Sequence, residues 1–215
     1  MKLFLIGATG RTGSEIVKQA LTRNDKLVAY VRTPSKLNIN DPKLTIVKGQ
    51  LDDVATMAAA MKGCEAVLVT LGNPISNSSG KLFSFAIPDI IKAMDQAKIN
   101  RLISLSALGV GTTLANTSYP YRMGAKSFLK GNFADHEAGE SQLKDSDLNW
   151  TTIHPGPLFN GKKTENPLVR DAASGYKMPG APRTYRGDVA QVMLRIIKDQ
   201  KTFGKQLIMC SGQDK

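Results

Sequence analysis

Cysteine and histidine are both scarce in this sequence, with two of each among 215 residues. Cys64 and Cys210 lie far apart and lack the spacing of metal ligands, so we expect two small core residues in a reducing compartment. No histidine–carboxylate spacing predicts a metal site, and two histidines are too few to argue a serine–histidine–acid arrangement. The sequence therefore favours neither metal chemistry nor a catalytic triad.

Long apolar runs are also missing. No stretch is long enough to span a bilayer, and the first apolar run, of only about five residues, is too short for the core of a signal peptide. We therefore expect a cytoplasmic protein that has no membrane partner.

Negative charge is in the minority, because the chain carries a formal charge of +11 at pH 7. The cations are scattered rather than clustered, and neither a glycine–aromatic RNA-binding signature nor a helix-turn-helix pattern is present. We expect no specific nucleic-acid partner. A general attraction for anionic ligands, including a phosphate-bearing cofactor, explains the charge more simply.

Glycine, by contrast, is concentrated near the start of the chain. An apolar run at residues 2–6 leads into Gly7, Gly10 and Gly13, and an apolar helical face follows. In this spacing the first glycine allows a sharp turn, the second lets the backbone approach a pyrophosphate, and the third lets the helix pack on the strand. A second strand at residues 26–31 completes a βαβ unit, so the pattern predicts a dinucleotide-binding turn.

The residue after the second strand indicates which cofactor binds. NAD-binding folds place an acid near this position, whereas NADP-binding folds place an arginine there for the 2′-phosphate. This chain has Arg32, and Lys36 adds a second cation, so we expect NADP(H) in preference to NAD(H). The alternative is that both are solvated loop cations.

Strands and helices alternate along the rest of the chain. The predicted fold is α/β, a Rossmann-type doubly wound parallel sheet in three αβα layers, with residues 1–215 forming one domain that includes a small C-terminal substrate region. At this length, 41% hydrophobic residues suffice for a large core. The later elements expected are strands at 65–71, 101–106 and 205–209, and helices at about 53–62, 81–98, 126–144 and 187–198, the last capped by Asp188 or its neighbour.

Ligands bind beyond the carboxyl ends of the strands in such sheets. Leu71, Gly72 and Asn73 should therefore lie across the cofactor from the glycine turn, although a helix-initiating loop without ligand contact is the alternative. Ser104 and Ser106 alternate by two and share one face or end of their strand. The loop from 107 to about 124 is long enough to form a binding site or a lid.

These motifs together resemble the atypical short-chain dehydrogenase/reductase group over nearly the whole chain. Within it, the chain looks most like NAD(P)H-binding proteins related to biliverdin reductase B, also called flavin reductase, and to NmrA-like sensors. The motifs that carry the resemblance are Gly7-Ala8-Thr9-Gly10-Arg11-Thr12-Gly13, Val31-Arg32, Val69-Thr70-Leu71-Gly72, Ser104-Leu105-Ser106-Ala107, Leu148 to Gly156 and Arg186-Gly187-Asp188-Val189-Ala190.

The resemblance implies a set of cofactor-binding residues. It assigns the pyrophosphate to Gly7, Thr9, Gly10, Arg11, Thr12 and Gly13, the 2′-phosphate to Arg32 and Lys36, the adenosine side to Gln50, Leu51, Leu71, Gly72 and Asn73, and the nicotinamide side to Ser104, Ser106, His136, Pro155, Gly156 and Pro157. Gln50 stands where the family usually has an aspartate that contacts adenine, and its carbonyl oxygen can still accept from the base amine.

A second departure from the family bears on mechanism. The Tyr-x-x-x-Lys pair of typical short-chain dehydrogenases is missing, because Tyr121 is followed four residues later by Ala125. Without a tyrosine of lowered pKa, alcohol oxidation is disfavoured, whereas hydride transfer to a stacked flavin needs less help from the protein. We expect an NADPH-dependent reductase of flavin-like or quinone-like acceptors, with Ser106 and Tyr121 as catalytic candidates and His136 orienting the cofactor ribose.

Several alternatives remain open. The two serines can satisfy backbone groups at a strand end, His136 can be a surface residue, and His154 before Pro155 suits a structural role. The aromatic residues Phe83, Phe85, Phe128, Phe133 and Trp150 are expected in the core rather than in a stacking platform. The rival functions are an NmrA-like NADP(H) sensor without turnover and an epimerase-like enzyme, and the expected assembly is a monomer or weak homodimer.

Overall fold

The mostly parallel sheet at the centre of the molecule has eight strands in the order β3-β2-β1-β4-β5-β6-β10-β8. This computed structural model describes residues 1–72, 81–127 and 130–212. The strands are β1 (Lys2–Ile6), β2 (Lys26–Val31), β3 (Leu44–Lys48), β4 (Ala66–Val69), β5 (Arg101–Leu105), β6 (Asn149–Pro155), β8 (Leu168–Asp171) and β10 (Lys205–Cys210).

Every pairing in this sheet is parallel except that of β8 with β10. The strand order reverses between β1 and β4, which is the position where open α/β sheets bind ligands beyond their carboxyl ends. The predicted Rossmann-type doubly wound sheet is therefore confirmed.

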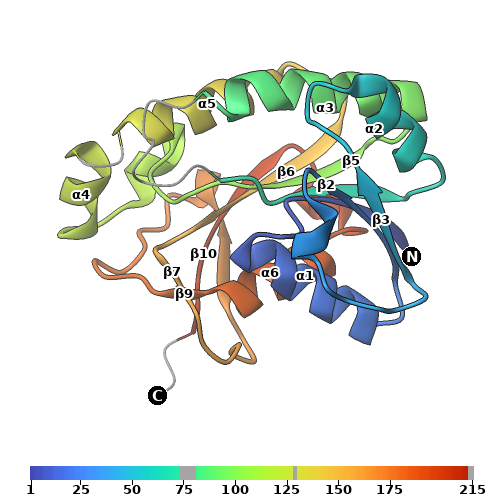
Figure 1. Ribbon diagram of the computed structural model, residues 1–215. Helices are drawn as coiled ribbons and strands as arrows, with labels where there is room; N and C mark the ends of the chain where they lie inside the picture. The colour runs from blue at the N-terminus through green and yellow to red at the C-terminus, as the bar shows by residue number, and fades with distance from the viewer. Residues whose placement is uncertain (73–80, 128–129, 213–215) are drawn as a thin grey trace.

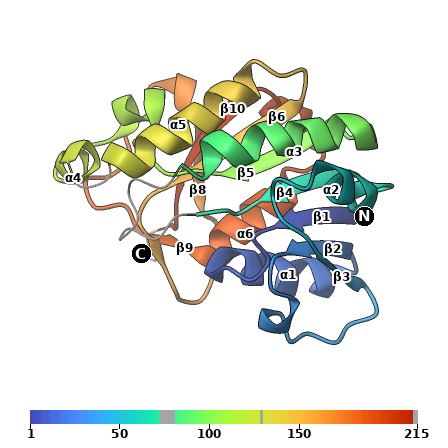
Figure 2. The same ribbon diagram turned by 45° about the horizontal axis from the view of Figure 1, so that its top comes forward.

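Helices cover both faces of the sheet, giving three layers (Figures 1 and 2). One face carries α1 and α6, and the other carries α2, α3 and α5. A shorter helix, α4, lies at the carboxyl end of the strands. The helix bounds are α1 (Arg11–Thr22), α2 (Val54–Met61), α3 (Phe83–Ala97), α4 (Tyr121–Ser127), α5 (Lys130–Lys144) and α6 (Arg186–Arg195). No helix among the described residues is long and apolar enough to cross a membrane.

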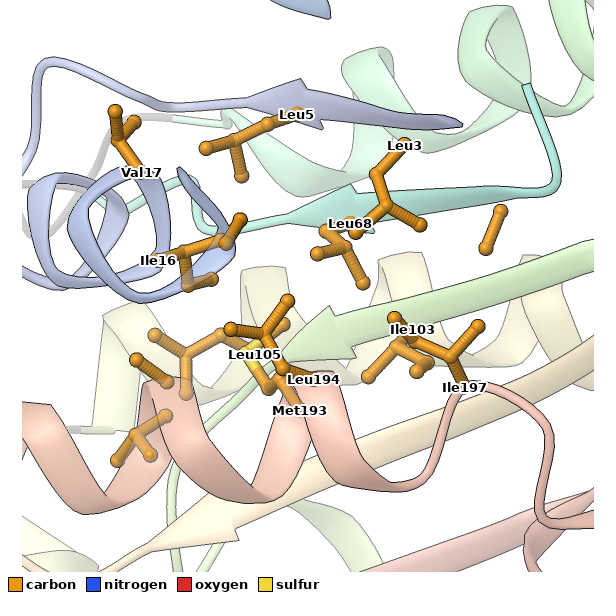
Figure 3. Packing of buried hydrophobic residues seen from close by; sticks show 14 of the residues in the cluster. Leu3, Leu5, Ile16, Val17, Leu68, Ile103, Leu105, Met193, Leu194 and Ile197 are labelled. Carbon is orange, nitrogen blue, oxygen red and sulfur yellow. The ribbon is translucent and has the colours of Figure 1, made fainter. Parts of the chain in front are cut away.

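Alternating residues of the buried strands supply two separate cores. Along β1, Leu3 and Leu5 face α1 and α6, while Phe4 and Ile6 face the helices on the other side. Figure 3 shows the first core, in which Leu3 and Leu5 gather with side chains from α1, β4, β5 and α6. This two-sided burial explains why the strands read as continuous apolar runs.

The strands and helices expected from local pattern fall within a few residues of their observed positions. Asp53 caps α2 by accepting from the N–H of Thr56 at 3.0 Å, as its acidic start predicted. Helical structure covers the described part of the span expected at 126–144 but begins earlier than expected, because α4 starts at Tyr121, inside the long loop; α5 runs from Lys130 to Lys144. A 3₁₀ helix at Gly111–Asn116 occupies another part of that loop.

The small region near the C-terminus contains β8 and a two-stranded ribbon of β7 (Leu158–Phe159) and β9 (Thr184–Tyr185), none of which the pattern predicted. The sequence predicted that Asp188 or its neighbour caps α6. Asp188 instead lies buried inside the first turn of the helix. It accepts from the N–H and hydroxyl of Thr164 and from the hydroxyl of Ser211. The carboxylate of Asp188 thus joins the segments that contain Thr164 and Ser211 to α6. Local spacing in the sequence does not reveal this role.

A buried guanidinium joins β5 to the segment after α6. Arg101 makes hydrogen bonds of 2.7–3.1 Å to five acceptors, and its Cζ lies 4.5 Å from the centroid of the Phe203 ring. The acceptors are the carbonyl oxygens of Asn149, Ile196 and Ile197 and the hydroxyls of Thr151 and Thr202. Burial lowers the pKa of Arg101 to about 10, so the group remains charged at neutral pH.

Replacing Arg101 with methionine removes these donors while keeping most of the side-chain volume. Three buried carbonyl oxygens then lose a partner, so we expect the free energy of unfolding to fall by about 3 kcal/mol, measured by urea denaturation. Arg195→Met, at an exposed position of α6, is the control and should change it by less than about 0.5 kcal/mol. Equal losses in the two variants would contradict the role assigned to Arg101.

Candidate functional site

The turn between β1 and α1 depends on close contacts between backbone segments. Gly7 has a φ of +91°, and a Cβ there would lie 2.7 Å from the carbonyl oxygen of Thr70 at the end of β4. A Cβ on Gly13 would collide with the carbonyl oxygen of Gly7. The chain therefore needs glycine at both positions, as the spacing predicted.

The start of α1 presents backbone donors to this turn. The N–H of Ser14 makes the first helical bond, to the carbonyl oxygen of Gly10 at 2.8 Å. The N–H groups of Arg11, Thr12 and Gly13 precede that bond, so they have no partner inside the helix. Together with the helix dipole, they form a site suited to an anion.

A cleft of about 740 Å³ opens beside the glycine turn, on the β1–β4 side where the strand order reverses. It brings together many of the predicted cofactor residues, namely Gly7, Thr9, Gly10, Arg32, Lys36, Gln50, Leu51, Leu71 and Gly72. Asn73 lies outside the described residues. The cleft is thus formed from the ends of β1, β2, β3 and β4, the arrangement that the sheet topology predicts for a nucleotide.

Other residues of the cleft were not singled out from the sequence. The buried Tyr30 donates its hydroxyl to the carbonyl oxygen of Gln50 at 2.9 Å and fills the space where Gly49 has no side chain. Lys81 adds a third exposed cation to Arg32 and Lys36. Phe85, expected in the core, is instead 68% exposed on the wall of the cleft. The cleft thus combines three cations and an apolar wall with two carboxylates, Asp52 and Asp89.

The cleft fits a phosphorylated dinucleotide. Glycines leave room where side chains would block the turn, and cations lie at the end of β2. The first N–H groups of α1 follow directly after that turn, although Arg11, Thr12 and Gly13 are not themselves among the residues that line the cleft. The residues predicted for the nicotinamide side, Ser104, Ser106, His136 and 155–157, do not line this cleft. Their roles toward the cofactor remain predictions.

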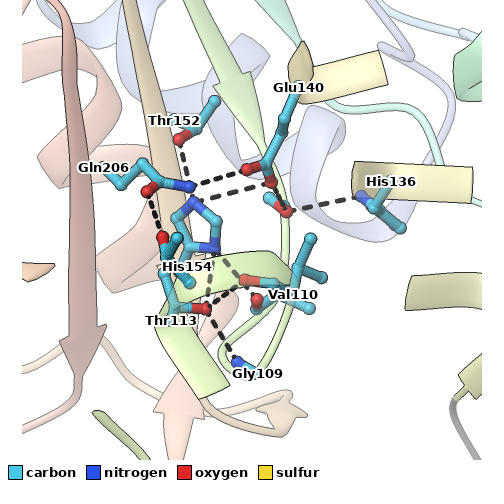
Figure 4. A network of polar contacts seen from close by, with 11 residues as sticks. Gly109, Val110, Thr113, His136, Glu140, Thr152, His154 and Gln206 are labelled. Atoms are coloured by element: carbon cyan, nitrogen blue, oxygen red, sulfur yellow. Dashed lines mark hydrogen bonds and ion pairs between the residues drawn. The ribbon is translucent and has the colours of Figure 1, made fainter. Parts of the chain in front are cut away.

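Ser106 belongs to a buried polar network at the carboxyl end of β5. Figure 4 shows this network, with Glu140, Gln206 and His154 labelled. The hydroxyl oxygen of Ser106 lies 2.5 Å from Oε1 of Glu140, a residue of α5 that the sequence did not reveal. Oε2 of Glu140 accepts from the amide of Gln206 at 2.8 Å, so the carboxyl group joins α5 to β5 and β10. Val69 pairs with Ser104 across β4 and β5, and Ser106 follows β5 as Leu71, a residue of the cleft, follows β4.

His154 closes the other side of this network and is fully buried. Its Nδ1 lies 3.0 Å from the carbonyl oxygen of Ala107, which can only accept, so Nδ1 carries the hydrogen. Nε2 is then an acceptor for the hydroxyl of Thr152 at 2.8 Å, and it lies 3.6 Å from Oε1 of Glu140. Burial lowers the pKa of His154 to about 4, so the ring is neutral and its role is structural, as expected.

His136 lies on α5, one turn before Glu140. Its ring stacks on Phe83 with centroids 3.8 Å apart, and its Nδ1 is 3.5 Å from the hydroxyl oxygen of Ser106. Burial, followed by the nearby His154, lowers the pKa of His136 to about 4. The preceding Asp135 accepts from three N–H groups at the start of α3, which fixes α5 against α3. His136 is thus a neutral neighbour of the serine.

Burial dominates the acidity of Glu140, which is 5% exposed. It raises the pKa from the ordinary 4.5 to about 7, against the lowering effect of the donors Ser106 and Gln206. No lysine or arginine makes an ion pair with this carboxyl group among the described residues. A carboxyl group whose pKa lies near 7, next to a hydroxyl group at the end of a strand, is typical of functional sites.

Tyr121 lies at the start of α4 and donates its hydroxyl to the carbonyl oxygen of Leu108 at 2.7 Å. Burial raises its pKa to about 12. Both features oppose acid–base chemistry at neutral pH, so the contacts of Tyr121 show a structural task and its catalytic role remains a prediction.

The comparisons with known proteins agree with this architecture. A family described as NAD(P)H-binding matches residues 7–200, and the chain belongs to that family. An uncharacterised sugar epimerase of Bacillus subtilis, YhfK, is 26% identical over 219 residues, covering 99% of this chain and 95% of its own. The oxidoreductase stcQ of Emericella nidulans is 28% identical over 196 residues, covering 81% of this chain and 68% of its own.

A solved structure is similar over nearly the full length. The short-chain dehydrogenase/reductase of Veillonella parvula in complex with NADP superimposes with a TM-score of 0.84 at 16% identity, covering 99% of this chain and 95% of its own. The likeness shows the fold. With the family match, it confirms the predicted resemblance to atypical short-chain dehydrogenases/reductases.

The raised pKa of Glu140 predicts a pH-dependent stability. Between pH 4.5 and about 7 the folded protein keeps a proton that the unfolded chain has released. The stability due to this proton is complete below pH 4.5 and is lost as pH rises through about 7, amounting to about 3 kcal/mol. Urea unfolding of wild type and Glu140→Gln across this range measures the effect, and the difference between them should shift in favour of the variant as pH rises.

The comparison with Glu140→Gln is needed because the two histidines act in the opposite sense. Their lowered pKa values remove stability as pH falls from 6.5 toward 4. Both proteins share this contribution, so it cancels in the difference. A difference that stays constant with pH would contradict a neutral Glu140.

Proposed function

We propose that this protein is an NADPH-dependent oxidoreductase that delivers hydride to a flavin-like or quinone-like small molecule. The observation that carries the proposal is the cleft at the β1–β4 switch point, with its glycine turn, free helix N–H groups and cations at the end of β2. Membership of the NAD(P)H-binding family supports the cofactor class. The relatives are named as an oxidoreductase and as a sugar epimerase, and these names indicate different reactions. The class of acceptor is therefore inferred from the residues of the site.

Different residues would bind different parts of the cofactor. The N–H groups of Arg11, Thr12 and Gly13 would hold the pyrophosphate, and Arg32 and Lys36 the 2′-phosphate. When bound, NADPH supplies the hydride. The chain contributes orientation and charge, which is most of what a protein adds to this chemistry.

The acceptor class follows from the proton donors at hand. Tyr121 has no lysine four residues on, and its hydroxyl bonds to a main-chain carbonyl group. Ser106, which follows directly after β5, is the other candidate. A serine is a weak acid, so it suits an acceptor that is easily reduced and needs only one polarising hydrogen bond.

The acceptor would be a free small molecule, bound by a monomer or weak homodimer in the cytoplasm, with no nucleic-acid or membrane partner. The even scatter of lysine and arginine along the sequence supports this reading over a nucleic-acid interface.

The cofactor preference predicts a selective effect at Arg32. Arg32→Ala should raise the Kd for NADPH by roughly 10- to 100-fold, because a charge-assisted pair to the 2′-phosphate is lost, and should change the Kd for NADH by less than about threefold. Quenching of protein fluorescence gives both constants. Lys18→Ala, an exposed cation on α1 outside the cleft, is the control. Equal weakening of both cofactors would contradict the assigned role of Arg32.

Turnover separates the reductase from its rivals. NADPH fluorescence should change when wild-type protein is added and should then decay rapidly once FMN or a quinone is supplied. Gly10→Glu is the control, since a carboxylate in the turn repels the pyrophosphate and should abolish both signals. Binding without decay, for both acceptors, would favour the sensor function and contradict the proposal.

A further inference from the structure

Glu140 is surrounded by neutral donors rather than by a cation in contact. Oε2 accepts from the amide nitrogen of Gln206 at 2.8 Å, and the amide oxygen of Gln206 accepts from the hydroxyl of Thr112 at 2.7 Å. Oε1 faces the hydroxyl of Ser106 and Nε2 of His154. The charged or titratable groups that face Glu140 are His136, Glu137 and Lys144 on α5 and His154 on β6.

The hydrogen-bonding capacity of these groups leaves two arrangements. Nε2 of His154 is an acceptor, because its ring hydrogen is on Nδ1, so it cannot donate to Glu140. When Glu140 is a carboxylate, the single hydrogen of Ser106 must point at Oε1, 2.5 Å away. When Glu140 is a neutral acid, Oε1 can carry the hydrogen and donate it to the serine oxygen. The serine hydrogen is then free to point elsewhere.

We propose that Glu140 is a positioning residue that controls the direction of the Ser106 hydroxyl hydrogen, releasing it toward the acceptor when neutral and withholding it when ionised. The proposal rests on the proposed function, in which Ser106 polarises the acceptor. No proton leaves Glu140 in this scheme. The acceptor gains the hydride and takes its proton from water, while the serine donates one hydrogen bond to the oxygen or nitrogen on which charge develops.

The consequence is a reaction that slows as pH rises. Burial places the pKa of Glu140 at about 7, so both arrangements are populated near neutrality. If only the neutral acid supports turnover, the rate should fall roughly 100-fold between about pH 6 and about pH 9. Glutamine at this position is permanently neutral, and its amide nitrogen can donate to the serine as the protonated acid does.

The first experiment measures kcat against pH with saturating NADPH and menadione, a quinone without an ionisable group. Wild type should show the alkaline fall. Glu140→Gln should keep activity within about threefold of the acidic wild-type value at every pH, and Ser106→Ala should be slow and independent of pH over the same range. Glu137→Gln, an exposed change on the same helix, should retain the fall.

Each outcome decides the proposal. An alkaline fall that persists in Glu140→Gln or in Ser106→Ala overturns it, as does a folded Glu140→Gln that is inactive at every pH, since the carboxyl group would then be transferring its own proton. If Glu140→Gln does not fold, Ser106→Ala still decides between the outcomes. A wild-type protein that binds NADPH but reduces no acceptor would overturn the proposed function. The proposed role of Glu140 toward Ser106 would then be overturned as well.

A second measurement needs neither cofactor nor turnover. The infrared carbonyl band of a protonated carboxylic acid should vanish as the pH of cofactor-free wild type is raised through about 7, and it should be absent from Glu140→Gln. Glu137→Gln should keep the band. A wild type without a band titrating in this range would overturn the proposal even if the protein proves to be a reductase.

Discussion

The close contact between the backbone of Gly7 and that of Gly13 is the constraint on which the turn between β1 and α1 depends. It lets α1 begin directly against the end of β1, so that the first helical N–H groups lie over the sheet edge instead of above a layer of side chains. The approach of Gly7 to Thr70 does the same for β4. Because the separation of β1 and β4 defines the switch point, these backbone contacts determine the space that a dinucleotide can enter.

Two electrostatic environments lie side by side at this end of the sheet. In the cleft, Arg32, Lys36 and Lys81 are exposed, so their attraction for phosphate is screened and is useful mainly for recognition. In the polar network, Ser106, Glu140 and His154 are buried. In these surroundings a charge is costly, and the direction of one hydrogen bond determines the direction of the neighbouring one. Leu71, which lines the cleft, and Ser106, which belongs to the buried network, follow the neighbouring strands β4 and β5.

The sequence predicted those features that depend on local pattern. Apolar runs and glycine spacing gave β1, α1 and β2, and the position of Arg32 after β2 followed from them. Glu140 could not be found this way, because its role depends on Ser106 after β5 and Gln206 on β10, which are 34 and 66 residues away in the sequence.

The expected burial of Phe85 was wrong for a related reason. Aromatic residues are buried on average, but Phe85 lies near the start of a helix beside the cleft, where its side chain is exposed. The two-residue strands β7 and β9 are too short to show a period.

Glu140 has a cost that the fold alone does not explain. Burying a carboxyl group without a cation destabilises a protein, and apolar residues of similar volume usually serve better in such a place. Arg101 is also buried, but its five donors bind β5 and β6 to the segment after α6, which accounts for its presence. Glu140 has two firm partners, one of them the hydroxyl that ends the strand beside the cleft. A buried carboxyl group that costs stability is characteristic of functional positions, and the hydroxyl of Ser106 is the partner through which we propose that Glu140 acts.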